Sequence, residues 1–191
     1  MASGKSLVAR MLRELGARVI DADLVARDVA TDADVRRAIA EAFGAEFMRP
    51  DGTLNREALA ERIFADPDAR ATLNAIMHPP IRRRIGEEVA ALRASRPDGV
   101  VVLDIPLLLD AAPAGTYDLD GIVVVFVDES TQEARLATRH RLARDAARAR
   151  LRAQRPLREK LAEATWVIDN SGTPEATRQQ VEALWRLWND A

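Results

Sequence analysis

The chain has 191 residues, of which 48% are hydrophobic, and its 28 Lys and Arg nearly balance its 30 Asp and Glu, giving a formal net charge of -2. Such a chain can bury a full core, which argues against disorder, and its charge argues against a wholly basic nucleic-acid binder. The lack of cysteine and the presence of only 2 histidines exclude disulfide frameworks, thiolate metal sites and histidine-rich metal sites. Its apolar runs are too short to span a bilayer and no signal peptide is visible, so we expect a cytoplasmic protein.

The first predicted element is a helix that opens with Gly4-Lys5-Ser6, the second half of a phosphate-binding loop. Alone, this tripeptide is common at exposed positions. Its context favours phosphate binding, because unpaired amides and the macrodipole at the start of an amphipathic helix attract an anion. In this interpretation Lys5 contacts the β- and γ-phosphates of ATP, and the Ser6 hydroxyl binds Mg²⁺.

Four short apolar runs predict strands buried on both faces, and hence an α/β fold with a parallel sheet flanked by helices. They cover residues 18–21, 100–106, 122–128 and 166–169. An aspartate stands at the end of each run: Asp21, Asp104, Asp128 and Asp169. Because parallel strands end at one edge of a sheet, we expect these carboxylates near one cleft.

Apolar residues at helical spacing predict helices over residues 7–15, 55–65, 81–95, 131–141 and 174–188. Residues 24–98 have a helical pattern and no convincing strand, and they exceed the dozen or so residues that one crossover needs. We therefore expect a helical subdomain, at about residues 30–98, inserted into a single domain that spans residues 1–191. Within it, His78-Pro79-Pro80 is predicted to begin a helix, with His78 either a cap or a functional residue.

Asp21 and Asp23 in the segment VIDAD allow two interpretations. They can cap the helix that follows, or one of them can accept the proton of an alcohol during phosphoryl transfer. The sequence does not decide which of the two acids would be the base.

An arginine-rich stretch runs from Arg135 to Arg158 and contains nine arginines but a single acid, Asp145. A solvated helix face is the plainer interpretation. The imbalance favours phosphate contact, because guanidinium groups clamp phosphate oxygens and uncompensated arginines repel each other. No aromatic residue lies between Phe126 and Trp166, so a mobile helical lid over a nucleotide, at about residues 139–160, fits better than a nucleic-acid surface.

The order of motifs along the chain resembles that of the dephospho-coenzyme A kinase family. The motifs occur in the same order as in that family and with compatible spacing, from residue 1 to about 187. They are Gly-Lys-Ser, VIDAD with the following Ala-Arg, DGTLNR, HPPIR, VVLDIPLLL, the segment from Gln132 to Arg139, the R-x-x-x-Q of Arg150 and Gln154, and VIDNSG. The resemblance implies a P-loop kinase with a three-layer α/β/α fold, a helical substrate-binding insertion and a helical lid. It also implies ATP- and Mg²⁺-dependent phosphorylation of the ribose 3'-hydroxyl of dephospho-CoA, the last step of coenzyme A synthesis.

Site residues follow from the same resemblance. Asp23 matches the base for the 3'-hydroxyl, and Asp21 would support it. Lys5 and Arg139 would complete the catalytic residues, with Lys5 at the β- and γ-phosphates and Arg139 facing the ATP phosphates from the lid, and Ser6 matches the metal ligand. The ATP site corresponds to Ala2, Ser3, Gly4, Lys5, Ser6, Leu7, Arg139 and Asn170, the last of these near the adenine within a predicted turn, Asp169-Asn170-Ser171-Gly172. The substrate site corresponds to Asp23, Arg27, His78, Asp104 and Leu107.

The sequence departs from the family at its start, where the first, central strand and the leading glycines of the loop are missing. Loss of that strand would leave buried backbone groups unpaired between residues 100–104 and 122–127, at about 1 to 3 kcal/mol each. We therefore expect the natural protein to begin about ten residues earlier. If it does not, we expect weak or absent kinase activity.

Three other functions compete with this prediction. The chain could be another P-loop kinase that acts on a nucleoside monophosphate or a small sugar acid. It could be a truncated remnant without catalytic activity. It could also bind RNA through the arginine-rich helices, with an affinity that falls steeply with salt.

Overall fold

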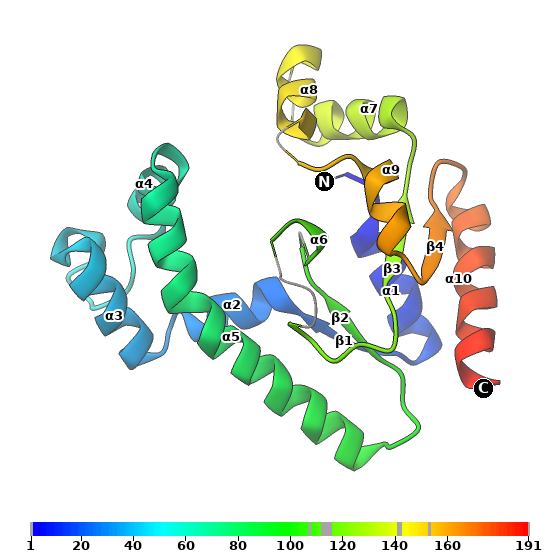
Figure 1. Cartoon of the computed structure of the whole chain (residues 1–191), viewed down its shortest axis with the longest axis horizontal. Helices are drawn as coiled ribbons and strands as arrows, with labels where there is room; N and C mark the ends of the chain where they lie inside the picture. The colour runs from blue at the N-terminus through cyan, green and yellow to red at the C-terminus, as the bar shows by residue number, and fades with distance from the viewer. Residues whose placement is uncertain (1, 107, 112–115, 141–142, 153, 191) are drawn as a thin grey trace. The chain divides into compact units, whose positions relative to one another are not determined.

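The computed structural model describes residues 2–106, 108–111, 116–140, 143–152 and 154–190. The chain divides into two compact units. Figure 1 shows the whole chain coloured by residue number. Unit 1 comprises Met1–Val19 and Pro106–Ala191, and unit 2 comprises Ile20–Ile105.

Strands form at all four predicted places: β1 (Arg18–Asp21), β2 (Val101–Asp104), β3 (Val123–Phe126) and β4 (Trp166–Asp169). Within the described residues they pair as two sheets, β1 with β2 and β3 with β4. β3 and β4 run parallel, with Val123 opposite Trp166 and Phe126 opposite Asp169, so both strands end at one edge. The expected parallel pairing is confirmed for these two strands.

The core of unit 1 forms around α1 (Lys5–Leu15) and α10 (Pro174–Asn189), which pack against each other. Leu12 on α1 and Val181 on α10 are fully buried, and Arg178 Nη2 lies 2.8 Å from Glu14 Oε2 at the rim of this contact. Unit 1 also contains α6 (Leu108–Ala111), α7 (Glu129–His140), α8 (Arg144–Arg152), α9 (Leu157–Lys160) and the 3-10 helix η2 (Leu161–Glu163).

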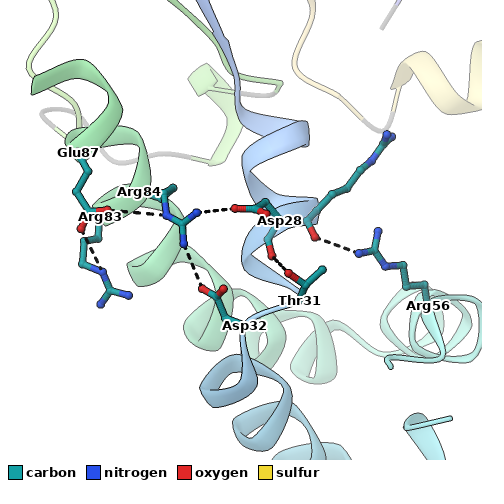
Figure 2. Close-up of polar contacts among 8 residues, drawn as sticks. Asp28, Thr31, Asp32, Arg56, Arg83, Arg84 and Glu87 are labelled. Carbon is teal, nitrogen blue, oxygen red and sulfur yellow. Dashed lines mark hydrogen bonds and ion pairs between the residues drawn. The ribbon is translucent and has the colours of Figure 1, made fainter. Parts of the chain in front are cut away.

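Helices dominate unit 2, as the pattern of residues 24–98 predicts. They are α2 (Ala22–Val29), α3 (Ala33–Phe43), the 3-10 helix η1 (Ala45–Phe47), α4 (Arg56–Ala65) and α5 (Pro67–Ser95). The long helix α5 contacts α2, α3 and α4, and its Ile85 is buried. Arg84, one residue earlier, reaches from α5 to Asp28 on α2 and to Asp32, which precedes α3 (Figure 2).

The predicted start of a helix at His78-Pro79-Pro80 is wrong. All three residues lie inside α5, which begins at Pro67 behind Asp66, whose side chain accepts hydrogen bonds from the amides of Asp68 and Ala69. Each internal proline lacks the N–H that would bond four residues back, but packing along the rest of this 29-residue helix carries it past both prolines.

Within the described residues, no helix is long and apolar enough to cross a membrane.

Candidate functional site

The remnant of the phosphate loop forms the start of α1. Gly4 precedes the helix with a φ of 93°, in the left-handed region that favours glycine, and its carbonyl accepts hydrogen bonds from the amides of Leu7 (2.9 Å) and Val8 (3.2 Å). Lys5 is half-buried and Ser6 is exposed in the first turn. The first amides of a helix have no partner within it, so this end of α1 has the backbone arrangement that suits a phosphate.

Asn170 joins this loop from the far end of the chain. It follows β4 and is buried, and its Nδ2 donates a hydrogen bond to the carbonyl oxygen of Ser3 at 2.7 Å. Its Oδ1 accepts a hydrogen bond from Thr177 Oγ1 at 2.8 Å. A Cβ added to Gly4 would lie 2.0 Å from Asn170 Nδ2, so a larger residue at position 4 would have to displace the Asn170 amide. Sequence reasoning missed Thr177, because nothing in the sequence links a threonine on the last helix to the first loop.

Asp128 and Asp169 lie together where β3 and β4 end. The Asp128 amide donates to Ser171 Oγ (3.1 Å), and the Asp169 carboxylate accepts from the Ser171 amide (2.9 Å), which confirms the predicted turn after β4. Hydrogen bonds from the Ser130 hydroxyl (2.5 Å) and the Thr131 amide (2.8 Å) hold the pKa of Asp128 well below its usual range. Both acids therefore stabilise the turns at this edge of the sheet.

The two acids of VIDAD have different surroundings. Asp21 ends β1 and caps α2, and its Oδ1 accepts hydrogen bonds from the amides of Asp23 (2.9 Å) and Leu24 (3.3 Å). The capping interpretation is thus confirmed for Asp21. Asp23 lies in the first turn of α2 with an exposed side chain.

The other predicted substrate residues lie on several elements. Arg27 is exposed on α2, and its carbonyl accepts a hydrogen bond from Arg56 Nη2 at 3.1 Å. Exposed His78 lies within α5, and Asp104 is the last residue of β2. Leu107 lies outside the described residues.

The arginine-rich stretch forms parts of α7, α8 and α9, and Arg139 is exposed on α7. The expectation that these arginines are uncompensated is wrong for two of them. Arg148 Nε donates to Glu133 Oε2 at 2.7 Å, and Arg155 pairs with Glu163. Both acids lie outside the stretch in sequence, which is why composition within it did not reveal the pairs. The bond to Glu133 raises the pKa of Arg148 above its ordinary value.

Within the residues that the structure describes, no three His, Cys, Asp or Glu side chains cluster in a way that could hold a metal ion.

Comparison with known proteins gives the family. The family model for dephospho-CoA kinase matches residues 1–175. A dephospho-CoA kinase from Geobacter metallireducens is 47% identical over 187 residues, which make up 97% of this chain and 92% of that protein. Another, from Symbiobacterium thermophilum, is 45% identical and covers 97% of this chain and 77% of the relative. The chain belongs to the dephospho-CoA kinase family.

As a dephospho-CoA kinase, the chain uses ATP as phosphate donor to convert dephospho-CoA into coenzyme A, which confirms the predicted enzyme class and substrate. These matches favour that activity over the other P-loop kinases and the non-catalytic remnant considered from the sequence.

Solved structures show the same fold. The crystal structure of TT1252 from Thermus thermophilus has a TM-score of 0.77 and 34% identity, and it covers 98% of this chain and 93% of that one. A dephospho-CoA kinase from Campylobacter jejuni, at 24% identity and a TM-score of 0.68, covers 100% of this chain and 94% of that one. The likeness confirms the predicted α/β P-loop kinase fold.

Proposed function

We propose that Asp23 is the general base of this kinase and that it accepts the proton of the ribose 3'-hydroxyl. The hydroxyl oxygen then attacks the γ-phosphorus of ATP, and the bond from that phosphorus to the bridging oxygen of ADP breaks. The products are ADP and coenzyme A, with the proton on the carboxylate. Lys5 neutralises charge on the β- and γ-phosphates, and Arg139 contacts the phosphates from the lid.

The contrast between Asp21 and Asp23 carries this proposal. The Oδ1 of Asp21 already caps α2 with two hydrogen bonds, so a substrate bound there would compete with the helix for that oxygen. Asp23 contributes only its backbone amide to this cap, and its own carboxylate is exposed in the first turn of α2. The general base must take up a proton and release it in each catalytic cycle. The exposed carboxylate of Asp23 suits this role better than the capping carboxylate of Asp21.

The proposed metal is Mg²⁺, with Ser6 as the ligand from this chain. The exposed Ser6 hydroxyl in the first turn of α1 supplies one hard oxygen, which suits a cation that keeps its remaining sites for phosphate oxygens and water. When bound, Mg²⁺ would neutralise charge that develops on the transferred phosphate.

The remaining assignments rest on the family motifs. We assign the ATP phosphates to the backbone of Ala2, Ser3, Gly4 and Leu7. Asn170 would lie near the adenine. Dephospho-CoA would contact side chains in the VIDAD, HPPIR and DIPLL segments, namely Arg27, His78, Asp104 and Leu107.

Substitution of each aspartate by asparagine separates catalysis from capping. Asp23→Asn should lower kcat by roughly 100-fold or more, since general bases contribute about 10² to 10⁴, whereas Asp21→Asn should keep most of the cap because Asn caps helices about as well as Asp. Asp34→Asn is the matched control: Asp34 is the second residue of α3 behind Asp32, as Asp23 is the second residue of α2 behind Asp21. Asp34→Asn removes the same charge from the same helix position and should leave kcat unchanged.

A larger loss of kcat in Asp21→Asn than in Asp23→Asn would overturn the assignment of Asp23 as the general base.

A further inference from the structure

The start of the phosphate loop is tied to the last helix of unit 1 through two consecutive hydrogen bonds. Thr177 Oγ1 donates to Asn170 Oδ1 at 2.8 Å, and Asn170 Nδ2 donates to the Ser3 carbonyl at 2.7 Å. We propose that Thr177 is a positioning residue for ATP binding, which acts on the phosphate loop through the amide of Asn170. This inference rests on the proposed role of Ser3 to Ser6 as the phosphate site.

The direction of the two hydrogen bonds follows from the groups involved. A backbone carbonyl can only accept, so the NH₂ group of Asn170 must face Ser3. The carbonyl oxygen of the amide then faces Thr177, and the Thr177 hydroxyl must donate to it. Because this hydroxyl has one proton, its contact with the Thr173 carbonyl at 3.2 Å competes with the shorter bond to Asn170. The Ser3 carbonyl therefore determines which way the Asn170 amide is turned, and the Thr177 hydroxyl holds the amide in that orientation.

Burial makes this arrangement hard to replace. Thr177 is 0% exposed and Asn170 is 3% exposed, so water has little access to take over a lost hydrogen bond. Without the hydroxyl, the Oδ1 of Asn170 would lose its buried donor, a situation that costs more than the loss of an exposed hydrogen bond. The amide would then be free to turn, and the donor that holds the Ser3 carbonyl would be lost with it.

The geometry of Gly4 shows how closely the amide and the loop fit together. With a φ of 93°, Gly4 brings the backbone so close to Asn170 that a Cβ would meet Nδ2 at 2.0 Å. A small rotation of the amide therefore disturbs the residue that precedes Lys5. A loop held in its binding conformation before ATP arrives binds more tightly than one that must be ordered on binding.

Thr177→Val tests this inference because it removes the hydroxyl and nearly preserves shape. The expected result is a rise in KM for ATP of about fivefold to tenfold, the change expected from one lost hydrogen bond, with the KM for dephospho-CoA nearly unchanged. Thr177→Ser keeps the hydroxyl and should restore the KM for ATP. In an Asn170→Ala background, Thr177→Val should have little further effect on that KM, because the two residues act in series.

Val181→Ala provides the matched control for stability. Val181 lies one turn further along α10 and is 0% exposed, but it is not part of the hydrogen-bonded chain. The Val181→Ala substitution should lower the melting temperature without changing the KM for ATP. Assays are run well below the melting temperature of each variant, and Thr177→Ala replaces Thr177→Val if the latter does not fold.

The inference is overturned if Thr177→Val leaves the KM for ATP unchanged, or if Val181→Ala raises it equally. Lys5→Ala distinguishes a failure of the positioning role of Thr177 from a failure of the proposed phosphate site. If Lys5→Ala weakens ATP binding and Thr177→Val does not, only the positioning role of Thr177 fails. If Lys5→Ala also has no effect, the phosphate site itself is wrong.

Discussion

Glu133 on α7 is buried, and its Oε2 accepts a hydrogen bond from Nε of Arg148 on α8, 2.7 Å away. The two side chains differ in exposure, with 8% of the glutamate and 50% of the arginine accessible to solvent. The pair therefore connects the buried carboxylate of Glu133 in unit 1 to α8 in the arginine-rich stretch. Arg148 thus has a structural role.

Arg148→Met should destabilise the protein by a few degrees in melting temperature, since it leaves the buried Glu133 carboxylate without this cation. Arg152→Met is the control, because Arg152 is exposed on the same helix, and it should have little effect. Addition of Glu133→Gln to Arg148→Met should recover part of the loss, because a neutral amide needs less compensation than a buried charge. Equal melting temperatures for Arg148→Met and Arg152→Met would contradict this account.

Gly4→Ala should impair the phosphate loop, and Gly86→Ala should not. The first places a Cβ 2.0 Å from Asn170 Nδ2 at a φ of 93°, which we expect to cost about 1 to 3 kcal/mol and to raise the KM for ATP at least tenfold. The second lies in α5 with no atom within 4 Å of the added Cβ, so it should stabilise the helix by about 0.5 to 1 kcal/mol. Thermal unfolding and ATP kinetics measured on both variants check the contrast, which fails if both substitutions behave alike.

Local patterns in the sequence were enough to predict the four strands, the helices α1, α4, α7 and α10, and the second half of α5. The four apolar runs are short, rich in β-branched residues and bounded by polar residues, so packing and local preference agree there. The prediction at His78-Pro79-Pro80 was wrong because the two prolines were taken to mark the first turn of a helix, whereas they lie inside α5. Asp66-Pro67 is the better start signal, a capping acid followed by proline at the first helical position, and it was visible in the sequence.

The site was less accessible to sequence reasoning, for a physical reason. Asp21 could be seen as a cap because it bonds to amides two and three residues away. The bond from Asn170 to Ser3 joins residues 167 positions apart, and no local propensity encodes it. Glu133 and Arg148 likewise come from different helices, so the charge balance of the arginine-rich stretch could not be judged from that stretch alone.

Arg84 should contribute to the packing of α2 on α5 more than its neighbour Arg83 does. Its guanidinium lies 2.5 Å from Asp28 Oδ2, 3.6 Å from Asp32 Oδ2 and 3.8 Å from Glu87 Oε2. Figure 2 draws these three contacts as dashed lines. Arg84→Met removes the cation among these three acids and should lower the free energy of unfolding by about 1 kcal/mol, a value limited by solvent screening.

Arg83→Met is the control for Arg84→Met, because Arg83 is 71% exposed and pairs only at 3.8 Å with Glu87 among the described contacts. Urea unfolding at low and high salt measures the difference, which should shrink as salt rises. A loss in Arg83→Met as large as in Arg84→Met would show that the ion pairs of Arg84 with Asp28 and Asp32 contribute nothing.

Asp128 should make stability depend on pH in the acid range. Hydrogen bonds from the Ser130 hydroxyl and the Thr131 amide favour its charged form, and its pKa in the folded protein is held far below the value of about 3.9 expected in the unfolded chain. The stabilisation is therefore complete above the unfolded pKa and is lost as the pH falls from there toward the folded pKa. Asp128→Asn should be less stable than the wild type at pH 7, because it gives up the charge at the start of α7, and the difference in stability should narrow below about pH 4.

Asp120→Asn removes the same charge from an exposed loop residue before β3 and controls for net charge. Melting temperatures measured from pH 7 to pH 3 test the effect, and a difference between Asp128→Asn and the wild type that stays constant over this range would contradict it.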